Sequence, residues 1–526
     1  PVFEGDATEF GGEVFAGWDS AELGRKLRAS LDAGNRRLAT NVSLEYLDAG
    51  DRRIGGGERI GPSAYESVAG RAALAWTPDT DTRWFLDLHF LEQESTPRVD
   101  ELVPGFGQTE PSSSEFFFEP NRRLFAHAQY DRANGPWDLD WRLSLAWQRI
   151  DDDRRTRDFG ADERSLERNR SDLAGAMLTA SKQTERGSWL VGFEAYRDEV
   201  SSSRVQQDIQ TGDLTASTPR FPDGSTVDQA ALFVNVDARL SDRHALSGGL
   251  RLNAVEVDLP ATLVSNEASV DVTDLSGDLG WRYDVTDTWQ LVANLGYGFR
   301  APNVFDLGTL GNRPGNRFNV PNTGLDSENV VQLDAGARRR GDDWQFEIMF
   351  YALDYDDRIT SVSTGATTPA GRDVVQSVNA AESRIQGVEF GATLLLSEHF
   401  DLDAVVSYTR GEQTIEGSDE PADRIPPLGG RLQLLYDSGG PLTVTSWLRF
   451  ADRQDRLSAR DIRDVRIDPN GTPGFAIVGT RADWRLTSGW AFSLGVDNIL
   501  DKRYRNHGSG IDAPGFNIAA SVSRQW

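Results

Sequence analysis

The stretch "DRANGPWDLDWRLSLAWQ" (131–148) combines a turn with a regular alternation of two kinds of side chain. Its first six residues include Asp, Asn, Gly and Pro, which tight turns favour. Large apolar side chains then occupy every second position: Leu139, Trp141, Leu143, Leu145 and Trp147. The positions between them include Asp140, Arg142, Ser144 and Gln148. Because successive side chains of a strand point to opposite faces, the pattern predicts a strand with one apolar and one polar face.

The same combination recurs along the whole chain. Ten short segments rich in turn-forming residues are each flanked by alternating stretches, as is typical of β-hairpins. They are residues 32–37, 77–82, 131–136, 182–188, 241–244, 284–288, 339–343, 397–400, 437–441 and 486–489. Ten hairpins predict twenty strands, and the alternating residues 11–18 and 516–526 add one strand at each end. We therefore expect twenty-two strands, with both ends of the sheet on the side of the short turns.

The connections between these hairpins are long and polar. Residues 91–121, 199–228, 300–328, 357–383 and 451–473 are rich in Gly, Pro, Asp and Ser. Short turns that alternate with long loops are typical of outer-membrane barrels, whose periplasmic turns are short and whose extracellular loops are long. In lipid every backbone polar group must be paired within the protein, so a sheet can span a membrane only by closing on itself.

The prediction is therefore an all-β fold in which residues 13–526 form one 22-stranded antiparallel transmembrane β-barrel. Its apolar strand faces would contact the lipid of a Gram-negative outer membrane. The alternative, a soluble propeller or repeat sheet, should repeat at a fixed period, and no such period is present.

Composition excludes several other classes of protein. The chain has 55 Lys and Arg against 82 Asp and Glu, and the net charge of −27 disfavours a nucleic-acid partner. Cysteine is absent, and the 5 histidines are scattered without metal-ligand spacing, so thiolate catalysis is excluded and metalloenzyme chemistry has no support. No run of about 18 apolar residues could form a membrane helix. We expect no enzymatic activity.

Two motifs resemble those of a known family. "YGFRAPNVFDLG" (297–308) and "NVPNTGLDSENV" (319–330) resemble the arginine-alanine-proline and asparagine-proline-asparagine-leucine boxes of TonB-dependent outer-membrane receptors. Residues 495–515 resemble the signature that precedes the last strand of these receptors. The resemblance covers essentially the whole chain and implies an active importer of a scarce solute, such as a ferric siderophore or a cofactor. The motif residues that it carries over are Arg300, Ala301, Pro302, Asn322 and Leu325.

The resemblance also implies partners. Family members carry a plug domain before the barrel, through which the TonB energy-transducing protein acts. Residues 1–12 are expected to be a junction segment that follows such a plug, which is itself missing from this sequence. Whether the plug is a separate chain, a cleaved domain or an omitted part stays open. The rival hypothesis is a passive pore without a plug, or a structural barrel that serves as a scaffold in a surface assembly.

One polar segment is the predicted ligand-binding site. "GNRPGNRFN" (311–319) contains Arg313, Asn316, Arg317 and Asn319. Two guanidiniums and nearby amides can hydrogen-bond a small-molecule cargo that bears a carboxylate or a phosphate. In the alternative, the arginines pair with acidic loops such as 151–153 and only hold the loops together. Residues 300–329 contain no histidine, which disfavours haem by analogy with the haem receptors of the family.

Two further segments have a functional and a structural interpretation. "SSSEFFFEPNRR" (112–123) places Phe116, Phe117 and Phe118 at the end of a predicted loop, as an apolar wall for a ligand or as part of the aromatic girdle. The carboxylates of 149–155 and 354–358 could bind calcium through oxygen ligands. Acidic loop tips need no ion, however, and no EF-hand spacing supports one. No other metal or cofactor is expected.

Overall fold

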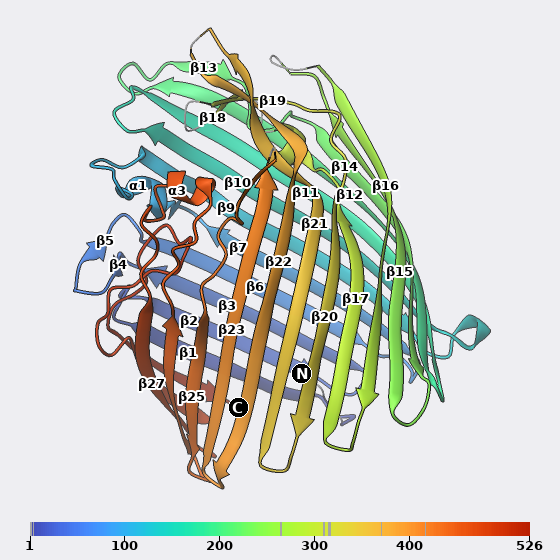
Figure 1. The fold of residues 1–526 in the computed structure, drawn as a ribbon. Helices are drawn as coiled ribbons and strands as arrows, with labels where there is room; N and C mark the ends of the chain where they lie inside the picture. The colour runs from blue at the N-terminus through green and yellow to red at the C-terminus, as the bar shows by residue number, and fades with distance from the viewer. Residues whose placement is uncertain are drawn as a thin grey trace.

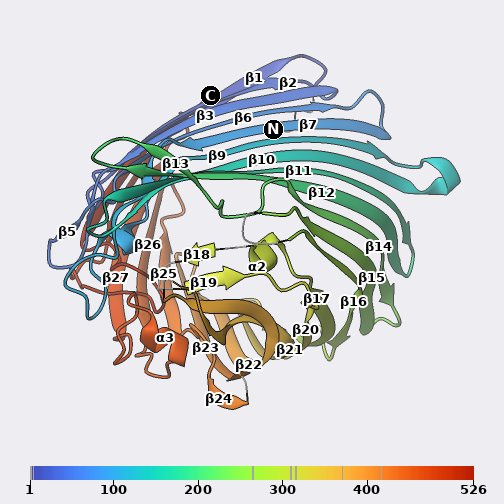
Figure 2. The same ribbon diagram turned by 90° about the horizontal axis from the view of Figure 1, so that it is seen from above.

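The chain folds into a closed β-barrel (Figures 1 and 2). The computed structural model describes residues 3, 5–262, 266–308, 311–313, 317–369, 371–415 and 417–526. Strand β1 (Glu9–Asp19) pairs with β2 (Arg25–Gly34) on one side and with β29 (Asn517–Gln525) on the other, both antiparallel. Because the last strand meets the first, the sheet has no free edge.

Twenty-two strands of the described residues form the wall, since five of the 27 strands in the sheet are short pieces of the outer loops. Besides β1, β2 and β29 they are β3 (Leu38–Ala49), β6 (Tyr65–Trp76), β7 (Thr82–Gln93), β9 (Ser113–Arg132), β10 (Asp140–Asp158), β11 (Glu163–Thr184), β12 (Gly187–Asp208), β14 (Ser225–Arg239), β15 (His244–Leu259), β16 (Ala268–Asp284), β17 (Trp289–Arg300), β20 (Glu328–Arg340), β21 (Trp344–Thr367), β22 (Asp373–Ser397), β23 (Phe400–Ile415), β25 (Gly429–Asp437), β26 (Leu442–Ala451), β27 (Phe475–Arg485) and β28 (Trp490–Asp497). The predicted fold class and strand number are confirmed.

The outer loops contain the remaining short elements. The short strands are β4 (Arg52–Arg53), β5 (Arg59–Ile60), β8 (Thr96–Pro97), β13 (Leu214–Ser217), β18 (Gly311–Arg313), β19 (Arg317–Val320) and β24 (Ser418–Pro421). The helices are α1 (Val99–Leu102), α2 (Val304–Gly308) and α3 (Ala459–Arg463), and a single 3-10 turn, η1 (Pro136–Asp138), lies at the opposite rim. In the described part of the chain no helix has the length and apolar character needed to cross a membrane.

Each of the ten predicted turns joins two consecutive strands of the wall. Figure 1 shows these turns along one rim. Two of them touch, because the backbone N–H of Asp437 donates to the carbonyl of His399 at 2.9 Å. At the same rim Gly12 and Trp526 exchange two backbone hydrogen bonds of 3.2 Å each. The C-terminal strand therefore completes the barrel on the side of the short turns.

Of the five predicted outer connections, 300–328 and 451–473 match the structure closely, whereas 91–121, 199–228 and 357–383 are shorter than predicted. Most of residues 357–383 belong to β21 and β22, which have 24 and 25 residues, and β9 begins at Ser113 and includes Phe116–Phe118. The connections 20–24 and 159–162 are also short. Above a membrane both faces of a hairpin meet water, so its strands need no apolar alternation. The polar composition of these strand ends is therefore the same as that of a loop, and it predicts loops where the structure has strands.

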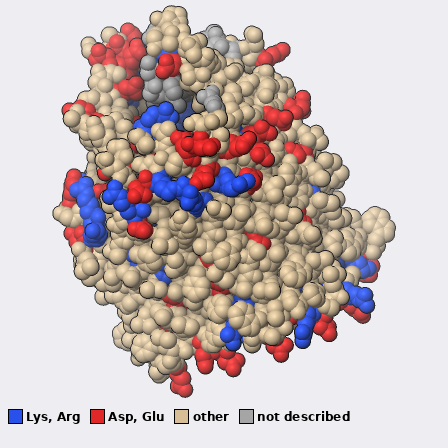
Figure 3. Space-filling model, viewed as in Figure 1, with Lys and Arg blue, Asp and Glu red and all other residues tan. Residues whose placement is uncertain are grey.

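The two faces of the wall differ as the alternation predicts. Leu232, Leu252 and Leu275 lie side by side on the outward face and are about half exposed. Figure 3 shows a largely uncharged band on the outer surface between charged rims. On the inward face Asp87 accepts hydrogen bonds from Arg71 at 2.8 Å and from His89 at 2.9 Å. The barrel therefore has an apolar outward face and a lumenal face that carries ion pairs, as in transmembrane β-barrels.

Candidate functional site

The segment 301–327 between β17 and β20 folds into the mouth of the barrel. Seen from above, α2, β18 and β19 lie inside the ring of wall strands (Figure 2). β19 forms a parallel pair with the outer end of β22, in which Arg317 lies opposite Asp373 and Val320 opposite Gln376. This segment, here called the mouth loop, therefore reaches from one part of the wall to another across the opening.

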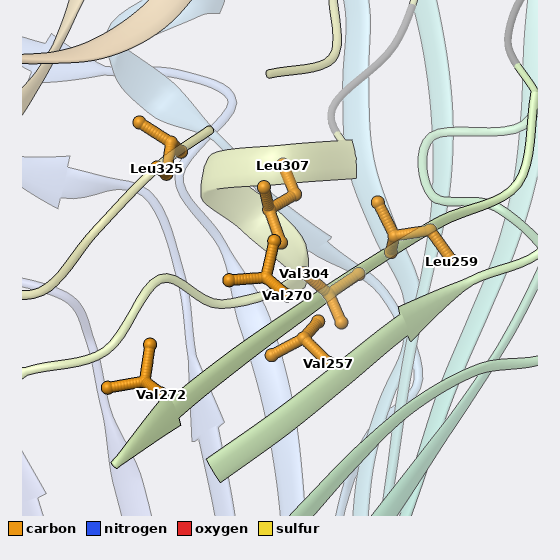
Figure 4. Packing of buried hydrophobic residues seen from close by; sticks show 7 residues of the cluster. All are labelled: Val257, Leu259, Val270, Val272, Val304, Leu307 and Leu325. Atoms are coloured by element: carbon orange, nitrogen blue, oxygen red, sulfur yellow. The ribbon is translucent and has the colours of Figure 1, made fainter. Parts of the chain in front are cut away.

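A small hydrophobic core attaches the mouth loop to the inner wall (Figure 4). Val304 and Leu307 of α2, together with Leu325, are almost fully buried. Their partners are four lumenal residues of β15 and β16: Val257, Leu259, Val270 and Val272. Full burial of a leucine or valine side chain contributes about 1.5–3 kcal/mol. The loop is therefore docked by its own apolar side chains.

Arg300 adds a polar anchor beside this core. Its Nε donates to Glu328 at 2.8 Å and its Nη1 donates to Asp306 at 2.6 Å. The second oxygen of Glu328 accepts from the backbone N–H of Ile359 at 2.6 Å. One guanidinium thus connects the end of β17 to α2, to the start of β20 and, through Glu328, to β21.

The other motif residues also hold the mouth loop. Pro302 is fully buried and Ala301 packs against the hydrophobic core. Asn322 donates from Nδ2 to the carbonyl of Ser377 on β22 at 2.8 Å, and its Oδ1 accepts from the N–H of Gly324 at 2.9 Å. Together with Arg300 and Leu325, these residues stabilise the loop in the opening.

Comparison with known proteins decides the family. Residues 45–499 match the family model described as TonB dependent receptor-like, beta-barrel. The chain belongs to the TonB-dependent receptor family. This is a family of transport receptors, not of enzymes.

Individual relatives of this TonB-dependent receptor barrel are distant. The ferric enterobactin receptor PirA of Pseudomonas aeruginosa is 24% identical over 347 residues, which are 61% of this chain and 44% of PirA. The ferrienterobactin receptor of Escherichia coli K12 is 21% identical over 346 residues, 62% of this chain and 44% of that receptor. The chain thus matches less than half the length of these curated relatives.

Solved structures share the fold. The copper transporter OprC superposes with a TM-score of 0.84 at 22% identity, covering 100% of this chain and 81% of OprC. The ferric yersiniabactin uptake receptor FyuA from Yersinia pestis superposes with a TM-score of 0.76 at 15% identity, covering 100% of this chain and 81% of FyuA. At these identities the likeness concerns the fold alone.

The structure places the predicted ligand residues of the receptor barrel in the mouth loop. Arg313 and Arg317 lie opposite each other in the β18–β19 hairpin, and Asn319 follows in β19. Asn316 lies outside the described residues. The backbone thus brings Arg313, Arg317 and Asn319 to the opening, and their role in binding stays a prediction.

The three phenylalanines do not form one continuous surface. Phe116 and Phe118 share a face of β9, with ring centroids 6.0 Å apart, whereas Phe117 lies between them in the strand and points to the other face. Each half-buried ring is covered by a guanidinium carbon at 4.7–5.0 Å from the ring centroid. The guanidiniums are those of Arg98 over Phe116, Arg155 over Phe117 and Arg154 over Phe118. Their use as a ligand wall stays a prediction.

The clustered carboxylates pair with arginines rather than facing one another. Asp151 is buried and accepts hydrogen bonds of 2.8 Å from both Arg122 and Arg170. Asp354 forms an ion pair of 2.6 Å with Arg384. Within the described ranges no three His, Cys, Asp or Glu side chains form a group that could hold a metal ion.

The residues that sequence reasoning missed are the lumenal partners of the mouth loop. The sequence of β15 indicates these partners, because its apolar side chains change from even-numbered to odd-numbered positions along the strand. Leu250 and Leu252 point outward, but Val257 and Leu259 have the opposite parity and point inward. Apolar side chains that point inward at the outer end of a barrel strand indicate that this end packs against a segment in the lumen. The partner helix α2 carries no comparable signal, because it is a single turn.

A second group of loops is joined by ion pairs near α3. Arg466 donates to Asp464 at 2.7 Å and forms an ion pair of 3.4 Å with Asp100, which lies in a different outer loop. Arg424 also hydrogen-bonds Asp464. Burial alone would raise the pKa of Asp464, but the hydrogen bonds from Arg466 and Arg424 outweigh it and lower this pKa to about 2. Asp464 therefore connects three outer loops.

This network predicts an acid-sensitive contact. The pKa of Asp464 in the folded protein lies below its ordinary value of 3.8, so its contribution to stability is present above that value and is lost as the pH falls toward about 2. Because the chain has no cysteine, a dye attached to Ile462→Cys on the exposed side of α3 can report on the loop. We expect a fluorescence transition between pH 4 and pH 2 that Asp464→Asn abolishes. The same transition in both proteins would contradict the assignment.

Proposed function

We propose that the chain is the barrel of an outer-membrane active importer for a scarce solute such as a ferric siderophore or a cofactor. Proteins of this family are outer-membrane transport receptors. Support for the cargo class comes from PirA and the ferrienterobactin receptor, which are named for ferric enterobactin.

The observation that carries the proposal is the docked mouth loop. A solute that arrives from outside meets this loop before it reaches the lumen. The hydrophobic core and Arg300 hold α2 and Leu325 in place, and the pairing with β22 holds the backbone of β19, which lowers the entropic cost of capture by the loop. Release into the lumen then needs energy. We assign its supply to TonB acting through a plug domain, either in cis or as a separate chain.

A double substitution in the mouth loop tests its role in cargo binding. Replacing Arg313 and Arg317 together with alanine should weaken binding of the native cargo tenfold or more, because each lost charge-assisted hydrogen bond contributes about 1.5–3 kcal/mol. Binding to whole cells measures this. Arg384→Ala is the control, since Arg384 is an exposed arginine that pairs with Asp354. Normal binding by the double variant would remove Arg313 and Arg317 from the ligand site.

Deletion of the gene tests the function itself. We expect the deletion strain to lose growth on one ferric chelate supplied as the only iron source, or on one other scarce cofactor, while growth on abundant iron stays normal. The full natural gene should restore growth. Unchanged growth on every such source would contradict an import function and favour the structural barrel.

A further inference from the structure

The inner wall carries an indentation on β25, β26 and β27. Cross-strand pairing places three lumen-facing residues in one row: Arg431 on β25, Arg449 on β26 and Ile477 on β27. The row toward the outer loops contains Gly429, Ala451 and Phe475 in the same order. Leu432 and Leu448, their neighbours in the chain, point outward to lipid. Small residues thus leave space directly above two arginines.

This indentation is a cavity of about 370 Å³. Its lining includes the two arginines and the row of Gly429, Ala451 and Phe475, together with Ser407 of β23, Asp452 after β26 and Asn506 of the loop between β28 and β29. Asn506 accepts a hydrogen bond of 2.6 Å from the Nη2 of Arg449, which orients that guanidinium. The guanidinium carbon of Arg449 also lies 5.5 Å from the centroid of the Phe475 ring. The site therefore combines oriented donors with an aromatic wall.

The two arginines oppose each other without an acidic partner. Arg431 and Arg449 occupy directly paired positions of an antiparallel pair, and both are exposed to the lumen. Like charges at such positions destabilise a sheet. Neither forms an ion pair in the part of the chain that the structure describes: Arg449 donates to Asn506, and the guanidinium carbon of Arg431 lies 5.3 Å from the centroid of the Trp447 ring.

Other lumenal arginines, in contrast, form ion pairs with acidic side chains. Arg71 pairs with Asp87 at 2.8 Å, Arg142 pairs with Asp131 at 2.6 Å, and Arg338 pairs with Glu347. In a chain of net charge −27, two adjacent unpaired guanidiniums are a local excess of positive charge. Two planar guanidiniums side by side fit the oxygens of a carboxylate or a phosphate.

We propose that the indentation formed by Arg431 and Arg449 binds the carboxylate or phosphate group of an anionic solute inside the lumen. The inference rests on the proposed import function and names the chemical class of its cargo. The site lies in the wall below the outer loops, so a solute released by the mouth loop reaches it next. The aromatic wall of Phe475 and the small residues above the arginines accommodate the uncharged part of the solute.

Citrate and inorganic phosphate are suitable probes for the test. Calorimetric titration of the detergent-solubilised protein should show saturable binding of at least one of them. The double variant Arg431→Gln/Arg449→Gln should bind at least about tenfold more weakly, since one charge-assisted hydrogen bond contributes about that factor. Arg431→Lys/Arg449→Lys keeps the charge but loses the planar fork, so an intermediate affinity is expected.

The matched control is Arg142→Gln/Arg338→Gln, which removes two lumenal guanidiniums from existing ion pairs and changes the net charge equally. We expect its affinity to match that of the unchanged protein. Absence of saturable binding, or equal weakening by control and test variants, would overturn the proposal. The outcome is separate from the import function: binding without cellular uptake refutes import alone, and uptake without binding refutes this site alone. The lysine variant, which retains both charges, keeps the test valid if the glutamine variant fails to fold.

Discussion

Leu307→Asp is expected to release the mouth loop from the wall and to abolish cargo binding while the barrel stays folded. Leu307 is 2% exposed at the centre of the core between α2, β15 and β16. Loss of its packing alone costs about 2–5 kcal/mol, as in other large-to-small core substitutions. A carboxylate at the same position would also have to be buried without a partner, which adds to the cost. The wall strands do not depend on this core, because their backbone ladder closes without it.

Limited proteolysis measures the release. We expect cleavage within 301–327 to become at least tenfold faster in Leu307→Asp. The mobility shift between heated and unheated protein on a gel should stay normal, since it reports the folded barrel. Thr323→Asp is the matched control, because Thr323 belongs to the same loop but is exposed. Unchanged cleavage in Leu307→Asp, or equal acceleration in both variants, would contradict the docking of the loop.

The parts of this fold that depend on neighbours in the sequence were predictable. Turn residues such as those of 437–441 act within a few positions, and the alternation of a membrane strand follows from lipid on one face and water on the other. The position of Trp526 beside Gly12 also follows, because a membrane sheet must close. Strand number and the ten turns were therefore predicted correctly.

The parts that depend on distant contacts were not predictable from one sequence. The core around Leu307 joins residues from three separate stretches, and Asp464 meets an arginine that also pairs with Asp100. The opposition of Arg431 and Arg449 exists only in the register of β25 and β26. Such contacts leave no local pattern, so the composition of these segments indicated only a polar loop or a polar strand face.

The second large effect is the loss of stability expected when a charge is placed on the lipid-facing side of the wall. Val234 and Asn235 are neighbours on β14, and the register assigns Val234 to lipid beside Leu250 and Asn235 to the lumen beside Gly249. Val234→Arg should destabilise the barrel by about 2–4 kcal/mol if it lies near the bilayer midplane, because a charged side chain is then held in hydrocarbon. Asn235→Arg places the same charge in the aqueous lumen and should cost less than about 1 kcal/mol.

Equilibrium folding into lipid vesicles, measured by urea titration, compares the two variants. The only differences between them are one position in the chain and the face to which the side chain points. Equal destabilisation, or greater destabilisation by Asn235→Arg, would mean that the assignment of the faces is wrong for β14.

The central claim is that the docked mouth loop belongs to an active importer rather than to an open pore. Accumulation of the native cargo by cells that produce the full natural protein tests this claim most directly. We expect saturable accumulation above the external concentration, which stops when a protonophore removes the energy source or when TonB is deleted. Uptake that rises linearly with concentration and continues without TonB would contradict it.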